Sequence, residues 1–225
     1  MTTSIRFNIY APIHKALRFF MTDTLQLLGR LDLEDASEVD AGLNQLESLL
    51  DAAVSHLQHE NDFIHPAIEA YSAGLSKRIA SEHRDHLDAI DTLRHSATAL
   101  RVDSDPMAAH RLYRQLAAFV AENFEHMDVE ETSHNHALWT GYSDAELMAL
   151  DGRILATVGP DEMGVWLKWL IRSSRPSERV QLMAGLPPEA RKPVMHMART
   201  LLNDRDWAKL CRATGAASVP GLAEC

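Results

Sequence analysis

The sequence predicts an all-α protein: an antiparallel up-down-up-down four-helix bundle followed by a C-terminal segment of short helices. Three observations support this fold class. Apolar residues recur at helical spacing through the first 140 residues, and both glycine and strand-like alternation are rare there. Proline becomes frequent after residue 143. We therefore expect two regions, the bundle over residues 1–140 and a helical segment of unknown role over residues 141–225.

Four long helices are expected in the first region. Polar stretches separate them, and the run from Asp103 to Pro106 supplies an N-cap followed by a proline at the first helical position. Short connections between long helices favour antiparallel neighbours. The expected helices span residues 9–30, 37–71, 76–100 and 106–137.

Shorter helices are expected in the second region. Ser143 and Glu146 have the spacing of a capping box, which predicts one helix start. The runs around Pro160, Pro176 and Pro188 predict further starts. The apolar cluster at residues 166–171 is expected to form the core of this segment, and a dimer interface is the alternative.

Composition excludes several classes of function. The net charge of −10 argues against a nucleic acid or an anionic membrane as partner, because both attract basic surfaces. Only two cysteines occur, Cys211 and Cys225, so a disulfide framework, a zinc ribbon and a CxxC redox site are excluded. The N-terminus lacks a signal-peptide pattern, and no apolar run is long enough to cross a bilayer. We expect a cytoplasmic protein.

Histidine is unusually abundant. The chain has 12 histidines against 4 tyrosines and 4 tryptophans, and 11 of the 12 precede residue 140. Because imidazole is a common metal ligand, this distribution calls for a test of metal binding.

Histidine and glutamate interrupt the apolar stripes of all four expected bundle helices. The second and fourth helices carry the same H-x-x-x-E pair, and the two pairs lie 70 residues apart. In an up-down-up-down bundle, the polar positions of all four helices fall toward the same end. These positions are His14 on the first helix, His56 and Glu60 on the second, His83 and His86 on the third, and His126 and Glu130 on the fourth.

The buried carboxylates in this pattern require a source of positive charge. An ionised carboxylate in a bundle core is costly unless it is paired, and the stripes contain no lysine or arginine. A pair of divalent metal ions supplies the missing charge and accepts both imidazole and carboxylate ligands.

This pattern resembles the hemerythrin-like, or HHE cation-binding, family. The run from His56 to Pro66, HLQHENDFIHP, is similar to the family signature H-x-x-x-E-x-x-h-h-x-P, in which h is apolar. The run from His126 to Glu131 resembles the corresponding motif of the fourth helix. The resemblance covers roughly residues 10–140 and includes four matched segments in order.

The resemblance implies a non-haem di-iron centre. The cofactor would be two iron ions, bridged by Glu60, Glu130 and an oxo or hydroxo group. The imidazole ligands would be His14, His56, His83, His86 and His126. The implied function is binding of O2 or a similar small ligand, such as NO or peroxide, in oxygen, redox or iron sensing or in storage. A homodimer through the C-terminal helices is a further expectation.

Two departures from oxygen-carrying relatives affect this interpretation. His83 and His86 are three residues apart, where those carriers usually have a spacing of four. Glu130 follows His126 by four residues, where they usually place the carboxylate five residues later, at the position of Glu131 here. We assign the bridge to Glu130, and His86 is the ligand that the spacing supports least.

The remaining histidines fall outside this set. His59, His65, His95 and His110 lie off the stripes and are expected to be solvated or to support the ligands. His134 and His136 are expected at the surface, and Glu131 is expected to face solvent or to bond a ligand imidazole.

Three alternatives remain open at this stage. The first is a di-iron oxidase, peroxidase or oxygenase on the same bundle, although a ligand-binding or sensing protein is favoured over a dedicated enzyme. The second is an iron or redox sensor that folds only when it is loaded with metal. The third is a site filled by zinc or manganese, because ligand type alone does not determine the metal.

Overall fold

The computed structural model describes residues 6–216, and all regular secondary structure in that range is helical, as predicted. The chain divides into two compact units, Met1–Gly159 and Pro160–Cys225. No helix within residues 6–216 combines the length and apolar character needed to cross a bilayer.

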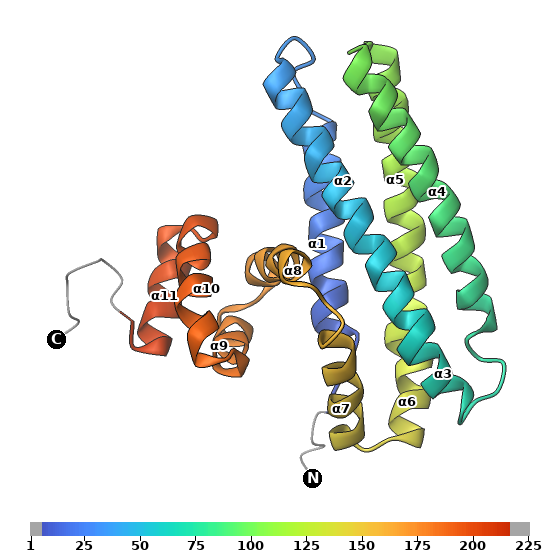
Figure 1. Ribbon diagram of the computed structural model, residues 1–225, viewed down its shortest axis with the longest axis vertical. Helices are drawn as coiled ribbons and strands as arrows, with labels where there is room; N and C mark the ends of the chain where they lie inside the picture. The colour runs from blue at the N-terminus through green and yellow to red at the C-terminus, as the bar shows by residue number, and fades with distance from the viewer. Residues whose placement is uncertain (1–5, 217–225) are drawn as a thin grey trace. The chain divides into compact units, whose positions relative to one another are not determined.

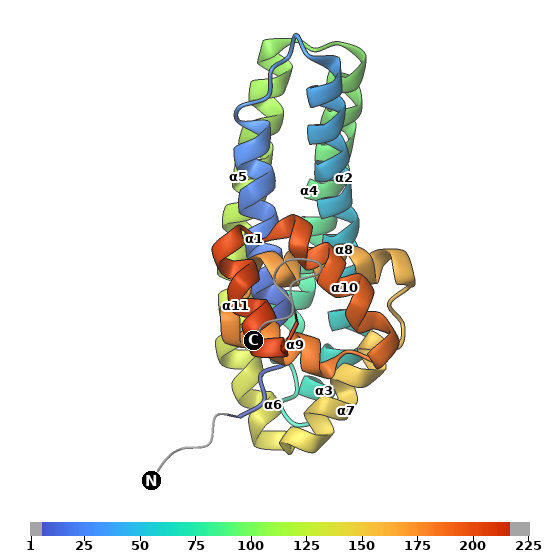
Figure 2. The same ribbon diagram turned by 90° about the vertical axis from the view of Figure 1, so that its left-hand side faces the viewer.

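Four long helices form the main part of the first unit and lie side by side (Figures 1 and 2). Helix α1 packs against α2 and α5, and α4 packs against the same two helices. Apolar stripes at helical spacing account for this packing, because each helix buries one face. The four helices are α1 (Ala11–Leu28), α2 (Ala36–His59), α4 (Lys77–Val102) and α5 (Pro106–Val129).

Side-chain caps explain where two of these helices begin. The Asp35 carboxylate accepts hydrogen bonds from the backbone N–H groups at the start of α2, and Asp105 does the same for α5. Pro106 occupies the first helical position of α5, as the sequence predicts. Gly74, with φ +86°, adopts a left-handed conformation in the connection before α4.

The second and fourth predicted helices are not continuous α-helices. A π-helical turn, η1 (Glu60–Ile64), separates α2 from α3 (His65–Glu69). A second π-helical turn, η2 (Glu130–His134), separates α5 from α6 (Asn135–Gly141). The Glu60 carbonyl accepts from the N–H five residues later, and the Glu130 carbonyl does likewise. Both departures from regular α-helix therefore start at the glutamates that the sequence pattern selected.

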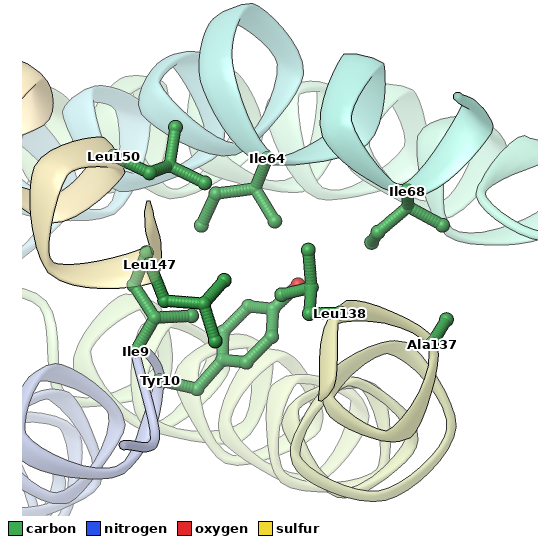
Figure 3. Packing of buried hydrophobic residues seen from close by; sticks show 8 residues of the cluster. All are labelled: Ile9, Tyr10, Ile64, Ile68, Ala137, Leu138, Leu147 and Leu150. Atoms are coloured by element: carbon green, nitrogen blue, oxygen red, sulfur yellow. The ribbon is translucent and has the colours of Figure 1, made fainter. Parts of the chain in front are cut away.

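A hydrophobic cluster closes the end of the first unit that contains η1 and η2 (Figure 3). Helix α7 (Asp144–Leu155) contributes Leu147 and Leu150, which pack with Ile64, Leu138 and the buried Tyr10 ring. The predicted capping box at the start of α7 is present. The first unit thus extends beyond residue 140, where we expected the bundle to end, because α7 completes this cluster.

The second unit has its own apolar core. Helix α10 packs against α8, and α11 packs against α9. Leu167 and Ile171 of the apolar cluster at residues 166–171 pack in this core, as expected. Prolines begin α8, α9 and α10 as expected. Cys211 is buried in α11, whereas Cys225 lies outside the described residues. The helices are α8 (Pro160–Ser173), α9 (Pro176–Gly185), α10 (Pro188–Leu201) and α11 (Asp204–Thr214).

Candidate metal centre

Six of the seven predicted site residues come together inside the first unit. They belong to two groups of four residues, in each of which the candidate ligand atoms lie within 4.8 Å of one another. Both groups contain Glu60 and Glu130, and all members are buried. The first group is His14, His56, Glu60 and Glu130, and the second is Glu60, His83, His126 and Glu130.

The two carboxylates each span both groups. Glu60 directs Oε1 toward His14 Nε2 at 3.4 Å and His56 Nε2 at 3.2 Å. Its other oxygen, Oε2, faces His83 Nε2 at 3.4 Å. Glu130 directs Oε2 toward His14 Nε2 at 3.5 Å and Oε1 toward His126 Nε2 at 3.3 Å. Each carboxylate therefore faces histidines of both groups.

Hydrogen bonds on the outer side of three imidazole rings hold them in place. His14 Nδ1 lies 3.1 Å from a Glu131 oxygen, so of the two positions expected for Glu131 the structure has the one in contact with a predicted site histidine. His83 Nδ1 lies 2.9 Å from Asn61 Oδ1. These acceptors favour a proton on Nδ1 and leave Nε2 to face the centre, as is common for metal-binding histidines.

Glu82 supports His126 in the same way, with 2.9 Å between its Oε2 and His126 Nδ1. Sequence reasoning missed the roles of Glu82 and Asn61. The sequence does contain a signal for the role of Asn61, because Asn61 follows Glu60 just as Glu131 follows Glu130. Glu82 directly precedes His83 but bonds the imidazole of the neighbouring helix, which sequence order alone does not indicate.

Neighbouring histidines lower the pKa values of both buried glutamates. Burial and the neighbouring Glu130 raise the pKa of Glu60, but His56 and His14 outweigh them and lower it overall. Burial also raises the pKa of Glu130, yet the nearby imidazoles of His126 and His83 lower it well below its usual value. Both glutamates are therefore ionised at neutral pH.

The pKa values of three histidines in the centre are also shifted, two of them upward and one downward. Burial lowers the pKa of His14, but its contacts with Glu131 and Glu60 outweigh that effect and raise it to about 9. His126 behaves similarly: burial lowers its pKa, and Glu130 raises it to about 9. For His56 burial dominates, and its pKa falls to about 4.

Several buried ligand atoms lack any hydrogen-bond partner among residues 6–216. These atoms are Glu60 Oε2, both carboxylate oxygens of Glu130 and His56 Nε2. A buried carboxylate oxygen without a partner carries a substantial desolvation cost. The donor set, with imidazole nitrogens and carboxylates directed at common points, fits divalent transition-metal ions.

His86, the seventh predicted residue, belongs to none of the groups found within residues 6–216. It is buried on α4, with its ring centroid 4.8 Å from that of His126. His86 Nδ1 is buried and makes no hydrogen bond within the described chain.

His65 and His134 are buried next to the centre, so the expectation of a surface position for His134 is wrong. With Glu130 they form a third group whose ligand atoms lie within 4.8 Å of one another. His134 follows Glu130 by four residues, a spacing that keeps both on the same side of the helix, whereas the π-helical turn η1 brings His65, five residues after Glu60, toward the core. His95, His110 and His136 are exposed, as expected.

Comparison with known proteins identifies one similarity. The model of the hemerythrin HHE cation-binding domain matches residues 11–133. This range contains all seven predicted site residues together with Asn61, Glu82 and Glu131. No curated protein and no solved structure gave a significant match.

Proposed function

Because the chain belongs to the hemerythrin HHE cation-binding family, with a match over more than half its length, we propose that it is a non-haem di-iron protein. It binds O2 or a related small ligand such as NO or peroxide, and it acts in sensing or storage. The observation that carries this proposal is the set of buried carboxylate oxygens of Glu60 and Glu130 that lack hydrogen-bond partners in the described chain. Two cations between these oxygens would remove the cost of burying them.

The proposed ligands divide between the two iron positions. His14 and His56 would hold one cation, His83 and His126 would hold the other, and Glu60 and Glu130 would contribute to both. The outer partners Asn61, Glu82 and Glu131 orient the rings and fix the proton on Nδ1. When bound, an iron pair supplies the electrons and the open coordination position that O2 binding requires.

The surrounding helices hold the polar centre rigidly and exclude water from it. We assign the four long helices to the predicted up-down-up-down antiparallel bundle, because α1 and α4 each pack against both α2 and α5. Buried apolar side chains surround the polar centre on these helices and limit the supply of protons to it. They include Leu17, Leu57, Ile90 and Phe119.

Metal analysis and a visible spectrum of the aerobically purified protein test this proposal. The expected result is two irons per chain, one for each group, with an oxo-to-iron charge-transfer band. His83→Ala should lower the iron content, whereas His95→Ala is a control on the exposed side of α4. Protein that takes up no iron, or that retains zinc or manganese in preference to iron, would contradict the proposal.

Two further expectations stay predictions. They are a cytoplasmic location and a homodimer through the C-terminal helices. Light scattering of the full chain and of a chain ending at residue 159 would test the second, because only the full chain should then be dimeric.

A further inference from the structure

An acidic pocket adjoins the candidate metal centre on the first unit. It has a volume of about 280 Å³, and residues of α4 and α5 line it. His126 lines this pocket and also belongs to the second ligand group, so the pocket and the centre share a side chain. We call this pocket the vestibule; its carboxylates are Glu82, Asp85, Glu122 and Glu125.

The charge of the vestibule is strongly negative. Arg78, the one arginine or lysine among the lining residues, pairs with Glu82 at 2.7 Å. Asp85, Glu122 and Glu125 are exposed and form no ion pair recorded between residues 6 and 216. A concave surface lined by one sign of charge concentrates counter-ions and accelerates their binding.

His86 connects the vestibule with the interior. It lines the vestibule, yet only 3% of its surface is exposed, and its Nδ1 is buried without a hydrogen-bond partner in the described chain. Its ring centroid lies 4.8 Å from that of His126. A buried polar atom without a partner next to a ligand group requires an explanation, and imidazole is a good ligand for divalent transition metals.

We propose that the vestibule is the site at which a divalent cation first binds, and that His86 is a transient ligand that passes the cation to His126 and the second group. This inference rests on the proposed function, because it requires a metal centre behind His126. It also gives His86 a role that its absence from both four-residue groups leaves open. The vestibule carboxylates would act on the rate of loading, and the six ligands of the centre would determine how many cations remain bound.

Stopped-flow loading of the metal-free full chain with Co²⁺ tests the proposal, because the visible bands of bound Co²⁺ report occupancy. The variant Glu122→Gln/Glu125→Gln removes two vestibule charges. The matched control Asp88→Asn/Asp91→Asn removes two exposed charges from α4 outside the vestibule. We expect the first variant to load about tenfold more slowly at low salt, with the difference shrinking at high salt. The final Co²⁺ content should equal that of the unmodified chain.

Equal rates in the two double variants would overturn the proposal, because the effect would then reflect net charge alone. His86→Leu should also slow loading while the final Co²⁺ content stays unchanged. Loss of one Co²⁺ per chain in His86→Leu would instead make His86 a permanent ligand and overturn its transient role. An unmodified chain that binds no cation would reject the proposed function as well, whereas normal binding with unaltered rates in all variants would reject the vestibule alone.

Discussion

His83 and His126 direct their Nε2 atoms at each other across 3.0 Å. Each ring also has an acceptor at Nδ1, supplied by Asn61 and Glu82 respectively. If both rings were neutral with the proton on Nδ1, two lone pairs would face each other at this distance. A proton or a metal ion between the two Nε2 atoms would remove this repulsion.

This arrangement predicts proton release when metal binds. Burial lowers the pKa of His14 and His126, but the carboxylates raise both to about 9, so these rings carry protons at neutral pH in the metal-free chain. A metal ligand must be neutral imidazole, so loading should release about two protons per chain. The apparent metal affinity should rise with pH and level off near pH 9. Titration calorimetry in buffers of different ionisation enthalpy measures the release, and a value of zero at neutral pH would contradict the prediction.

The shared carboxylates predict a graded effect of substitution. Glu130→Gln removes the charge that both groups use, so we expect loss of at least one metal ion per chain. Glu131→Gln changes the outer partner of His14 and the ion pair with Arg18, and it should weaken binding by about 10- to 100-fold without changing the number of sites. Metal analysis after dialysis against a chelator series distinguishes them. Full metal content in Glu130→Gln would exclude a bridging role.

We expect removal of metal to lower the stability of the fold while most of the helix remains. The four long helices bury extensive apolar stripes, so we expect circular dichroism of the chelated protein to keep most of its helical signal. The melting temperature should fall, because a ligand at 1,000 times its Kd stabilises the folded state by about 4 kcal/mol. Collapse of the helical signal on chelation would instead favour the alternative of a sensor that folds only when loaded.

The contribution of α7 to the first unit predicts that Leu147→Ala is costly. Leu147 is fully buried in the cluster around Tyr10, and replacing a buried leucine by alanine costs about 2–5 kcal/mol. Met148→Ala on the same helix is the control, because Met148 is 55% exposed. Its effect should stay within about 0.5 kcal/mol. Urea denaturation measures both, and equal effects would show that α7 does not stabilise the first unit.

Two truncated chains test the same contribution of α7. A chain that ends at residue 159 keeps α7 and should retain the stability and metal content of the full protein. A chain that ends at residue 142 loses Leu147 and Leu150 and should unfold at lower urea concentration. If the two truncated chains unfold at the same concentration, the boundary expected at residue 140 describes the stable unit better.

The sequence by itself determined the helical class, the helix starts marked by Pro106 and Ser143, and six of the residues that converge at the centre. These predictions depend on local chemistry and on the regular 3.6-residue repeat, which holds along α1, α2, α4 and α5 up to Glu60 and Glu130. The repeated H-x-x-x-E pair needed no tertiary information, because both members lie one turn apart on one helix.

Only the tertiary structure decided what lies beyond those glutamates. The π-helical turns break the repeat there, so a side chain that a regular helix would turn away from Glu60, such as His65, lies inward. The positions of two further side chains also depend on how the helices pack. Glu82 bonds a ring on another helix, and His86 lines the vestibule. A periodic pattern describes one helix at a time, whereas these contacts arise from how helices pack and from where their hydrogen bonding changes register.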